Sequence, residues 1–180
     1  MACHYLCWFN VVPVYFLNRL RMSNILKKLF SLFGRNEETP DPQALPAPMA
    51  TFDKPKVRAI VRQWILYVDA QETLPDDIVA LNFNVWEAMD EDFTSCYTLE
   101  LIGSRQYDAE DDDWACEDDF EPKERNCDTL QLSSEIPWED VLKGMVEVLK
   151  ELKDELGGIS LFRVEHITVG FAEGDLVIIK

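Results

Sequence analysis

The hydrophobic period of this 180-residue chain switches twice from a helical to a strand pattern, and this constrains its fold more than any other feature. Apolar residues recur every three or four positions over residues 54–71 and 137–156, and at every second position over residues 78–87 and 167–171. Steps of three and four place apolar side chains on one face of a helix, whereas strict alternation places them on one face of a strand. The sequence therefore predicts two helices, each followed by strands.

The first helix is expected to end before the breaker sequence Leu-Pro-Asp-Asp at residues 74–77. A turn over residues 89–94 then joins the strand at 78–87 to a returning strand at 96–102, so this pair is predicted to be a hairpin. The side chains expected to face the core from these elements are Val57, Ile60, Val61, Trp64, Ile65, Val68, Val79, Leu81, Phe83, Val85, Tyr97, Leu99 and Leu101.

The second helix carries start and stop signals in addition to its period. Pro137 suits the first turn, where Glu139 and Asp140 lie beside the positive end of the helix dipole, and Gly157-Gly158 ends the pattern. Its apolar stripe comprises Trp138, Val141, Leu142, Met145, Leu149, Leu152 and Leu156.

The C-terminal part is predicted to be a second hairpin, with a turn over residues 172–175 and a return over 176–179. Residues 130–132 are a candidate for a further short strand. Hairpin connections favour an antiparallel sheet of about four strands with helices packed on one face. The expected fold class is α+β, in the order α-β-β-(acidic loop)-α-β-β.

The chain is expected to divide into four parts. Residues 1–21 are interpreted as an upstream extension, because the sequence from Met22 onward is typical of a natural protein start. Residues 22–35 form a short amphipathic segment, and residues 36–53 form a proline-rich linker, because prolines keep a chain extended. Residues 54–180 are predicted to be a single α+β domain.

The apolar run at residues 4–17 is shorter than the roughly 18 residues that a membrane span needs, and it contains Pro13. We therefore expect no stable membrane insertion. The amphipathic pattern at residues 23–33 fits either a weak membrane-surface or partner-docking helix, or a helix that packs on its own domain.

The net charge is −17, from 34 acidic and 17 basic residues. Such a surface repels phosphate backbones, which argues against direct nucleic-acid binding and favours basic partners, although acidity can also serve solubility alone. The odd number of cysteines and their spacing show no disulfide framework, and a His/Cys zinc site would need scattered ligands, so we reject one. Reduced cysteines favour a cytoplasmic location. The oligomeric state is left open.

The acidic residues are concentrated in one stretch, residues 108–121, which we call the acidic segment. A helix–loop–helix calcium loop that began at Asp108 would place Asp113 where glycine is required and Asp119 where the bidentate glutamate is required, so that motif fails. A weak divalent-ion site remains an alternative.

A second interpretation is a surface for a basic partner, because charge gives steering and selectivity while desolvated aromatics give binding energy. The candidate partner-binding residues are Asp111, Asp112, Asp113, Trp114, Glu117, Asp118, Asp119 and Phe120. Alternatively, Trp114 and Phe120 fold inward and anchor the segment while its carboxylates face water. The two interpretations are compatible.

Catalysis is not favoured by any pattern. Paired catalytic carboxylates need a cleft that separates their pKa values. His166 lies among apolar neighbours on a strand, and Cys116 lies among carboxylates that weaken a thiolate. Gly170 and Gly174 match no phosphate-binding loop. We therefore predict no catalytic residue, metal ligand or cofactor.

Two blocks carry a resemblance: residues 111–116 (Asp-Asp-Asp-Trp-Ala-Cys) followed by Phe120, and residues 170–176 (Gly-Phe-Ala-Glu-Gly-Asp-Leu). Together they resemble a group of small acidic bacterial proteins of unassigned function, similar in style to immunity proteins that neutralise polymorphic toxins. The resemblance covers roughly residues 75–180 and implies a bacterial cytosolic protein that binds a partner.

The sequence thus predicts an acidic protein-binding module, such as an immunity protein that neutralises a basic, nucleic-acid-cleaving toxin. The alternative is a divalent-metal-dependent or carboxylate-based enzyme.

Overall fold

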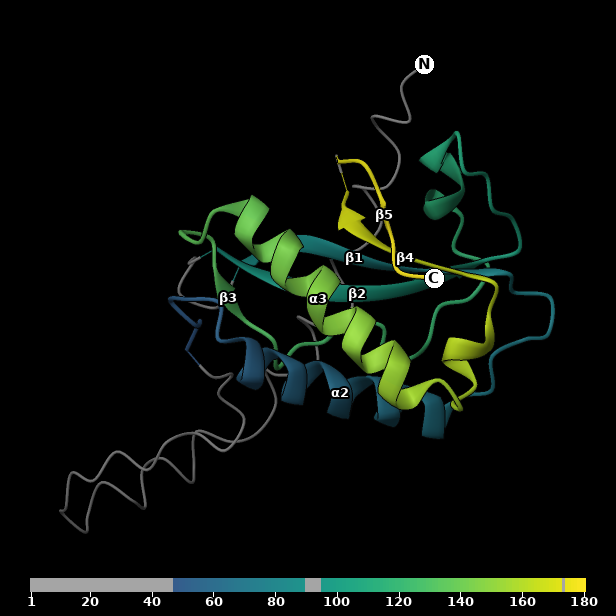
Figure 1. Cartoon of the computed structure of the whole chain (residues 1–180), viewed down its shortest axis with the longest axis horizontal. Helices are drawn as coiled ribbons and strands as arrows, with labels where there is room; N and C mark the ends of the chain where they lie inside the picture. Colours follow the sequence, from purple (N-terminus) through teal and green to yellow (C-terminus); the bar gives the residue numbers. More distant parts are fainter. Residues whose placement is uncertain (1–46, 90–94, 173) are drawn as a thin grey trace, which may run out of the picture. The chain divides into compact units, whose positions relative to one another are not determined.

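The helices and strands expected from the hydrophobic periods are present in the computed structural model, which describes residues 47–89, 95–172 and 174–180 (Figure 1). All of these residues fall within one compact unit, Leu45–Lys180. The predictions for residues 1–21 and 22–35, and for most of 36–53, lie outside the described residues.

The observed elements follow the expected order with additions. Short 3-10 helices interrupt the two long connections, and a further strand precedes the second helix. In chain order the elements are α2 (Lys54–Gln71), β1 (Ala80–Met89), β2 (Ser95–Ser104), η1 (Asp112–Cys116), β3 (Leu132–Ser133), α3 (Trp138–Leu156), η2 (Leu161–Arg163), β4 (His166–Phe171) and β5 (Val177–Ile178).

The strands form one five-stranded sheet in the order β3-β2-β1-β4-β5. Strand β1 pairs antiparallel with β2, with Phe83 opposite Leu101, and parallel with β4, with Phe83 opposite Val169. The outer pairs β2–β3 and β4–β5 are antiparallel. Both expected hairpins are thus present.

The prediction of a wholly antiparallel, four-stranded sheet is wrong. The two hairpins join through β1 and β4, which run in the same direction, because α3 lies between β2 and β4 in the chain and supplies the crossover that parallel neighbours need. The predicted order of elements also left out β3, although residues 130–132 were named as a candidate for a further short strand and overlap it at Leu132. The α+β class itself is correct, and both helices cover the same face of the sheet (Figure 1).

The helix ends are set by local residues. At the start of α2, the Asp53 carboxylate accepts a hydrogen bond from the backbone N–H of Lys56 at 3.2 Å, and proline occupies the first turn. Helix α3 has Glu139 and Asp140 in its first turn and ends at Gly157, as its sequence signals predict.

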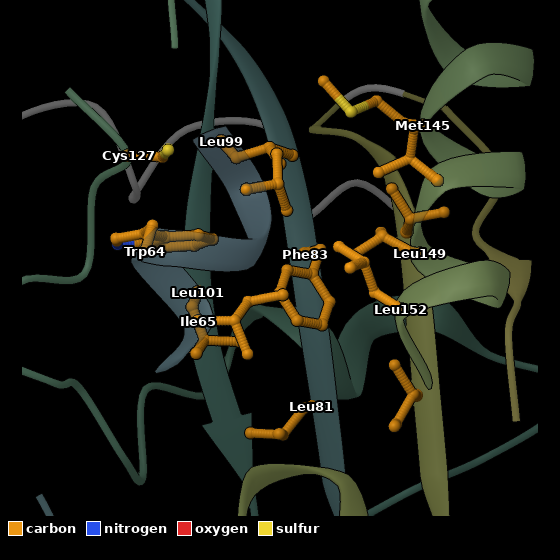
Figure 2. Close-up of a cluster of buried hydrophobic side chains, with 14 of the residues drawn as sticks. Trp64, Ile65, Leu81, Phe83, Leu99, Leu101, Cys127, Met145, Leu149 and Leu152 are labelled. Carbon is orange, nitrogen blue, oxygen red and sulfur yellow. The ribbon is translucent and has the colours of Figure 1, made fainter. Parts of the chain in front are cut away.

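The core lies between the sheet and the two helices. Phe83 of β1 is fully buried at its centre, with the Trp64 ring of α2 edge-on at 6.2 Å and Met145 and Leu149 of α3 in the same cluster (Figure 2). Alternation along β1 sends Leu81, Phe83 and Val85 to this face, as the sequence predicts.

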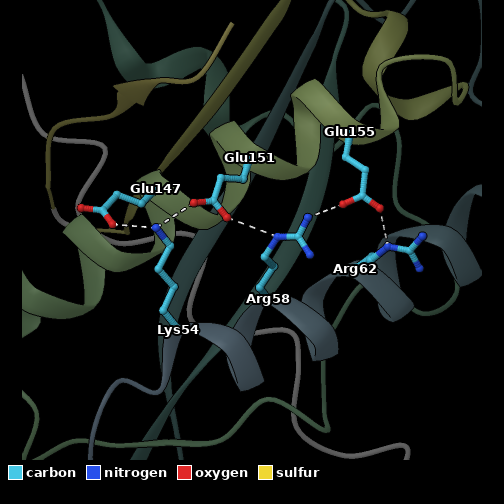
Figure 3. A network of polar contacts seen from close by, with 6 residues as sticks. All are labelled: Lys54, Arg58, Arg62, Glu147, Glu151 and Glu155. Carbon is cyan, nitrogen blue, oxygen red and sulfur yellow. Dashed lines mark hydrogen bonds and ion pairs between the residues drawn. The ribbon is translucent and has the colours of Figure 1, made fainter.

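Helices α2 and α3 are also joined at their surface by an ion-pair ladder of Lys54, Arg58 and Arg62 with Glu147, Glu151 and Glu155 (Figure 3). Lys54 lies 2.9 Å from Glu147 and 2.8 Å from Glu151, and Arg62 lies 2.8 Å from Glu155. Residue numbers rise along both helices, so the helices point the same way. These hydrogen bonds hold the pKa values of Glu147 and Glu155 below their ordinary range.

The described end of the predicted linker packs on the domain. Met49 exchanges backbone hydrogen bonds with Gln131 and Ser133, both at 2.8 Å. The Phe52 ring covers Gly144 of α3, where an added Cβ would lie 2.4 Å from it. The residues just before α2 therefore belong to the packed structure.

Among the helices of the described ranges, none combines the length and the apolar character that crossing a membrane requires.

We predict that Phe83→Ala lowers the free energy of unfolding by about 3–5 kcal/mol, because the ring is fully buried and its removal leaves a cavity. Urea unfolding followed by circular dichroism measures this loss. The matched control is Tyr67→Ala on α2, whose ring is 49% exposed and whose removal should change stability by less than about 0.5 kcal/mol. Equal losses in the two variants would contradict the assigned core.

Candidate functional site

The acidic segment leaves the end of β2 and returns along the outer edge of the same strand. Gly103 and Phe120 exchange two backbone hydrogen bonds, each 2.9 Å long. Further along, Leu101 donates to Arg125 at 2.9 Å and Cys127 donates to Leu99 at 2.8 Å. The return path therefore covers the backbone edge that β2 would otherwise expose.

The first contact of this return needs a glycine. A Cβ at Gly103 would lie 3.0–3.1 Å from Leu81, Ile78 and the Phe120 Cβ, which is closer than side chains normally approach. The absence of a Cβ at Gly103 lets the backbone of Phe120 come within hydrogen-bonding distance. Phe120 itself is only 8% exposed, and its ring enters the main core.

Trp114 anchors the other half of the segment. It lies in η1, is only 6% exposed, and packs its ring 5.3 Å from that of Tyr107. Tyr107 in turn stacks on His166 of β4, with 3.6 Å between ring centroids and 5° between planes. The Trp114 Nε1–H finds no acceptor among the described residues, so its anchoring depends on ring packing.

Arg105, just before the segment, pairs with Asp119 near the segment's other end and with Asp77, which precedes β1. Its guanidinium lies 2.5 Å from the Asp77 carboxylate and 2.6 Å from that of Asp119, and its backbone N–H donates to Asp119 at 2.9 Å. This backbone hydrogen bond and the guanidinium hold the pKa of Asp119 below its ordinary value, and the guanidinium does the same for Asp77. Asp119 therefore faces inward to Arg105.

Backbone hydrogen bonds fix the carboxylates around η1. The Asp111 carboxylate accepts from the backbone N–H of Asp113 at 3.1 Å. The Asp112 carboxylate accepts from the backbone N–H of Leu176 at 3.0 Å, which ties η1 to the turn before β5. A segment of like charges thus holds a defined backbone path.

The acidic residues of the segment other than Asp119 and Glu121 are exposed, although some of their carboxylates also accept backbone hydrogen bonds. Within residues 47–89, 95–172 and 174–180, none of them forms an ion pair with a basic side chain. These outward carboxylates are Asp108, Glu110, Asp111, Asp112, Asp113, Glu117 and Asp118. Of the predicted partner-binding residues, the structure groups Asp111, Asp112, Asp113, Glu117 and Asp118 at the surface, and it places Trp114 and Phe120 inside.

A second charged group lies beside the segment. Arg125 pairs with Glu100 of β2 and, at 2.8 Å, with Glu121, while Asn84 of β1 donates to Glu100 at 3.3 Å. Asp118 lies in the field of this group. Partial burial of its carboxyl, together with the hydrogen bond and charge of Glu121, raises its pKa to about 6, although Arg125 opposes the shift.

Sequence reasoning missed Arg105, Tyr107 and Arg125, which hold the segment in place. One arginine at each end of a run of acidic residues is a signal for ion pairs that fix the run, because opposite charges close in space stabilise each other. Nothing in the local sequence connects Tyr107 with His166, which is a contact of the tertiary fold.

Metal binding and thiol chemistry find little support in the described residues. No group of three or more histidine, cysteine, aspartate or glutamate side chains among them is arranged to hold a metal ion. Burial raises the pKa of the Cys127 thiol to about 12, which keeps it protonated and unreactive at neutral pH.

Comparison of the chain with family models, with curated proteins and with solved structures finds no match. The arrangement of the acidic segment must therefore carry the functional argument.

We predict that Asp118→Asn stabilises the protein relative to wild type at pH 7 and that this advantage shrinks toward pH 4. The folded protein holds the Asp118 proton up to a pKa of about 6, above the ordinary value of 3.8. The folded state therefore binds more protons than the unfolded state between these values, and wild-type stability falls as pH rises through this window. Urea unfolding at a series of pH values measures the difference; parallel curves for the two proteins would contradict it.

Proposed function

We propose that this protein is an acidic protein-binding module that presents the outward carboxylates of the acidic segment to a basic partner surface. The observation that carries the proposal is an array of exposed carboxylates on a fixed backbone path, none of which forms an ion pair with a basic side chain of the described residues. Trp114 and Phe120 anchor it from inside, and Arg105 and Leu176 hold its backbone path.

The physical argument is one of charge complementarity. Carboxylates on a fixed backbone path lose less entropy on binding, and their negative field attracts a cationic surface and raises the association rate. Because they can occupy the positions of phosphates in a nucleic-acid-binding cleft, the partner class that fits best is a basic, nucleic-acid-cleaving protein. The proposed biological role is that of an immunity protein.

One observation favours the second candidate, a carboxylate-based enzyme. Asp118 has a raised pKa and lies near Glu100, Glu121 and Arg125, and enzymes that use carboxylates for acid–base chemistry separate pKa values in this manner. A titration of the protein with magnesium, calcium and manganese tests the metal-dependent form of this candidate, since a true site should bind below about millimolar concentration.

We predict that the variant Asp111→Asn/Asp112→Asn/Asp113→Asn loses at least about tenfold in affinity for the basic partner, with a weaker dependence on salt. Asparagine keeps a side-chain oxygen that can accept from Asp113 and Leu176, so the backbone path should persist. The full chain serves as bait in the lysate of its source cell. The captured protein is then purified and its affinity measured by calorimetry at several salt concentrations.

The matched control is Asp76→Asn/Asp154→Asn/Glu165→Gln, which removes the same charge from exposed positions outside the segment. Its affinity should stay within about threefold of wild type. Equal losses in both triple variants would show that net charge alone acts, and unchanged affinity in the first would remove the acidic segment from the interface.

A further inference from the structure

A cluster of aromatic side chains lies at the start of α3, and we call Tyr97, Trp138 and Phe171 the aromatic patch. The Phe171 ring of β4 is edge-on to Tyr97 of β2 at 5.5 Å and to Trp138 at 6.1 Å. Trp138 was expected to face the core as part of the α3 stripe, but it is 54% exposed. The helix stripe therefore ends at Val141, and Trp138 covers the edge of the core while one side of its ring faces water.

The surroundings of the aromatic patch are acidic. Glu87 of β1 is the register partner of Tyr97, and Glu139 follows Trp138 in the chain. Both carboxylates are close enough to Tyr97 to raise its pKa, after the larger effect of partial burial. Within the described part of the chain, neither carboxylate forms an ion pair, and Lys143, one turn further along α3, is not paired with Glu139.

A purely structural role explains part of this arrangement. Glu139 and Asp140 favour the helix start through the dipole, and Trp138 shields Phe171. Neither role requires the large Trp138 ring to stay exposed to water. Met89, which lies on the same face of β1 as Glu87, is also 64% exposed. Positions that contribute most to binding energy in protein interfaces are enriched in tryptophan, and polar residues often surround them.

We propose that the aromatic patch is a docking surface for an arginine-bearing segment of a basic protein partner. A guanidinium over the Trp138 ring gains a cation–π contact, and Glu87 and Glu139 can pair with it from the rim. A second copy of this strongly acidic chain is a poor occupant, because like charges would meet at the rim. The inference rests on the proposed function only in taking the partner to be basic.

The test uses the full chain and a synthetic arginine–glycine repeat peptide, with the citrulline form of the same peptide as the uncharged probe. Binding is measured by calorimetry at low salt, and the indole N–H resonances are followed by NMR. We expect the arginine peptide to shift the Trp138 indole signal and to bind more tightly than the citrulline peptide. Trp138→Leu, which keeps an apolar contact for Phe171 but has no aromatic face, should lose about fivefold in affinity.

Tyr67→Ala is the matched control, since Tyr67 is an aromatic residue of similar exposure on α2. Its affinity for the arginine peptide should equal that of wild type. Equal losses in Trp138→Leu and Tyr67→Ala, or no shift of the Trp138 indole signal, would overturn the proposal.

The triple-asparagine variant of the acidic segment separates this inference from the proposed function. If Trp138→Leu weakens binding of the peptide and the triple variant does not, the aromatic patch is the docking surface and the acidic segment is not the site. If only the triple variant weakens binding, the acidic segment is the site and the aromatic patch is excluded. Losses in both variants support two surfaces for one basic partner.

Discussion

The structure depends on strand β1, which is hydrogen bonded along both edges and buried on the face beneath the helices. Its antiparallel pairing with β2 is local, but its parallel pairing with β4 brings the C-terminal residues to the centre of the sheet. Phe83 and its alternating neighbours require a cover, and α2 and α3 provide it from one side only. The common direction of the helices then follows, because each precedes one of two parallel strands and crosses back over the same face.

The acidic segment shows how a run of like charges can keep one conformation. Repulsion among its carboxylates opposes folding, and three kinds of contact offset it: buried aromatic rings, the guanidinium of Arg105, and backbone N–H groups that donate to the carboxylates of Asp111 and Asp112. Among the described residues, only Asp119 and Glu121 of the segment form ion pairs with basic side chains. The other carboxylates have no basic side chain paired with them, which is the condition that an electrostatic binding surface needs.

Much of the fold could be predicted from sequence, because period and end signals are local. The α3 pattern, with Pro137 before it and Gly157 after it, gave the helix to within one residue. The direction of β4 relative to β1 could not be predicted, since alternation reports which face is buried and says nothing about which neighbour a strand chooses. Trp138 was misassigned for a related reason: the helical period continues through it, although its ring contacts Phe171 at the end of β4 and stays 54% exposed.

For the candidate site, the outward position of Asp111, Asp112 and Asp113 agrees with the sequence analysis, and their place in an interface is still a prediction. The alternatives for Trp114 and Phe120 could not be separated from sequence, because an aromatic residue within a charged loop fits a core as well as an interface. The contacts that bury the two rings belong to the tertiary fold: Trp114 packs on Tyr107, which stacks on His166, and Phe120 enters the main core.

The parallel pairing of β1 and β4 has a consequence for the kinetics of folding. The buried hydrogen bond between Asn82 and Thr168, 3.0 Å long, joins residues 86 positions apart. Closing so long a loop costs entropy before any stabilising contact forms, and this loop contains the acidic segment, whose carboxylates repel one another. We therefore expect the central pairing to form late, after the β1–β2 hairpin and α3. Folding should be slow for a protein with this helix content, and faster when salt screens the repulsion within the loop.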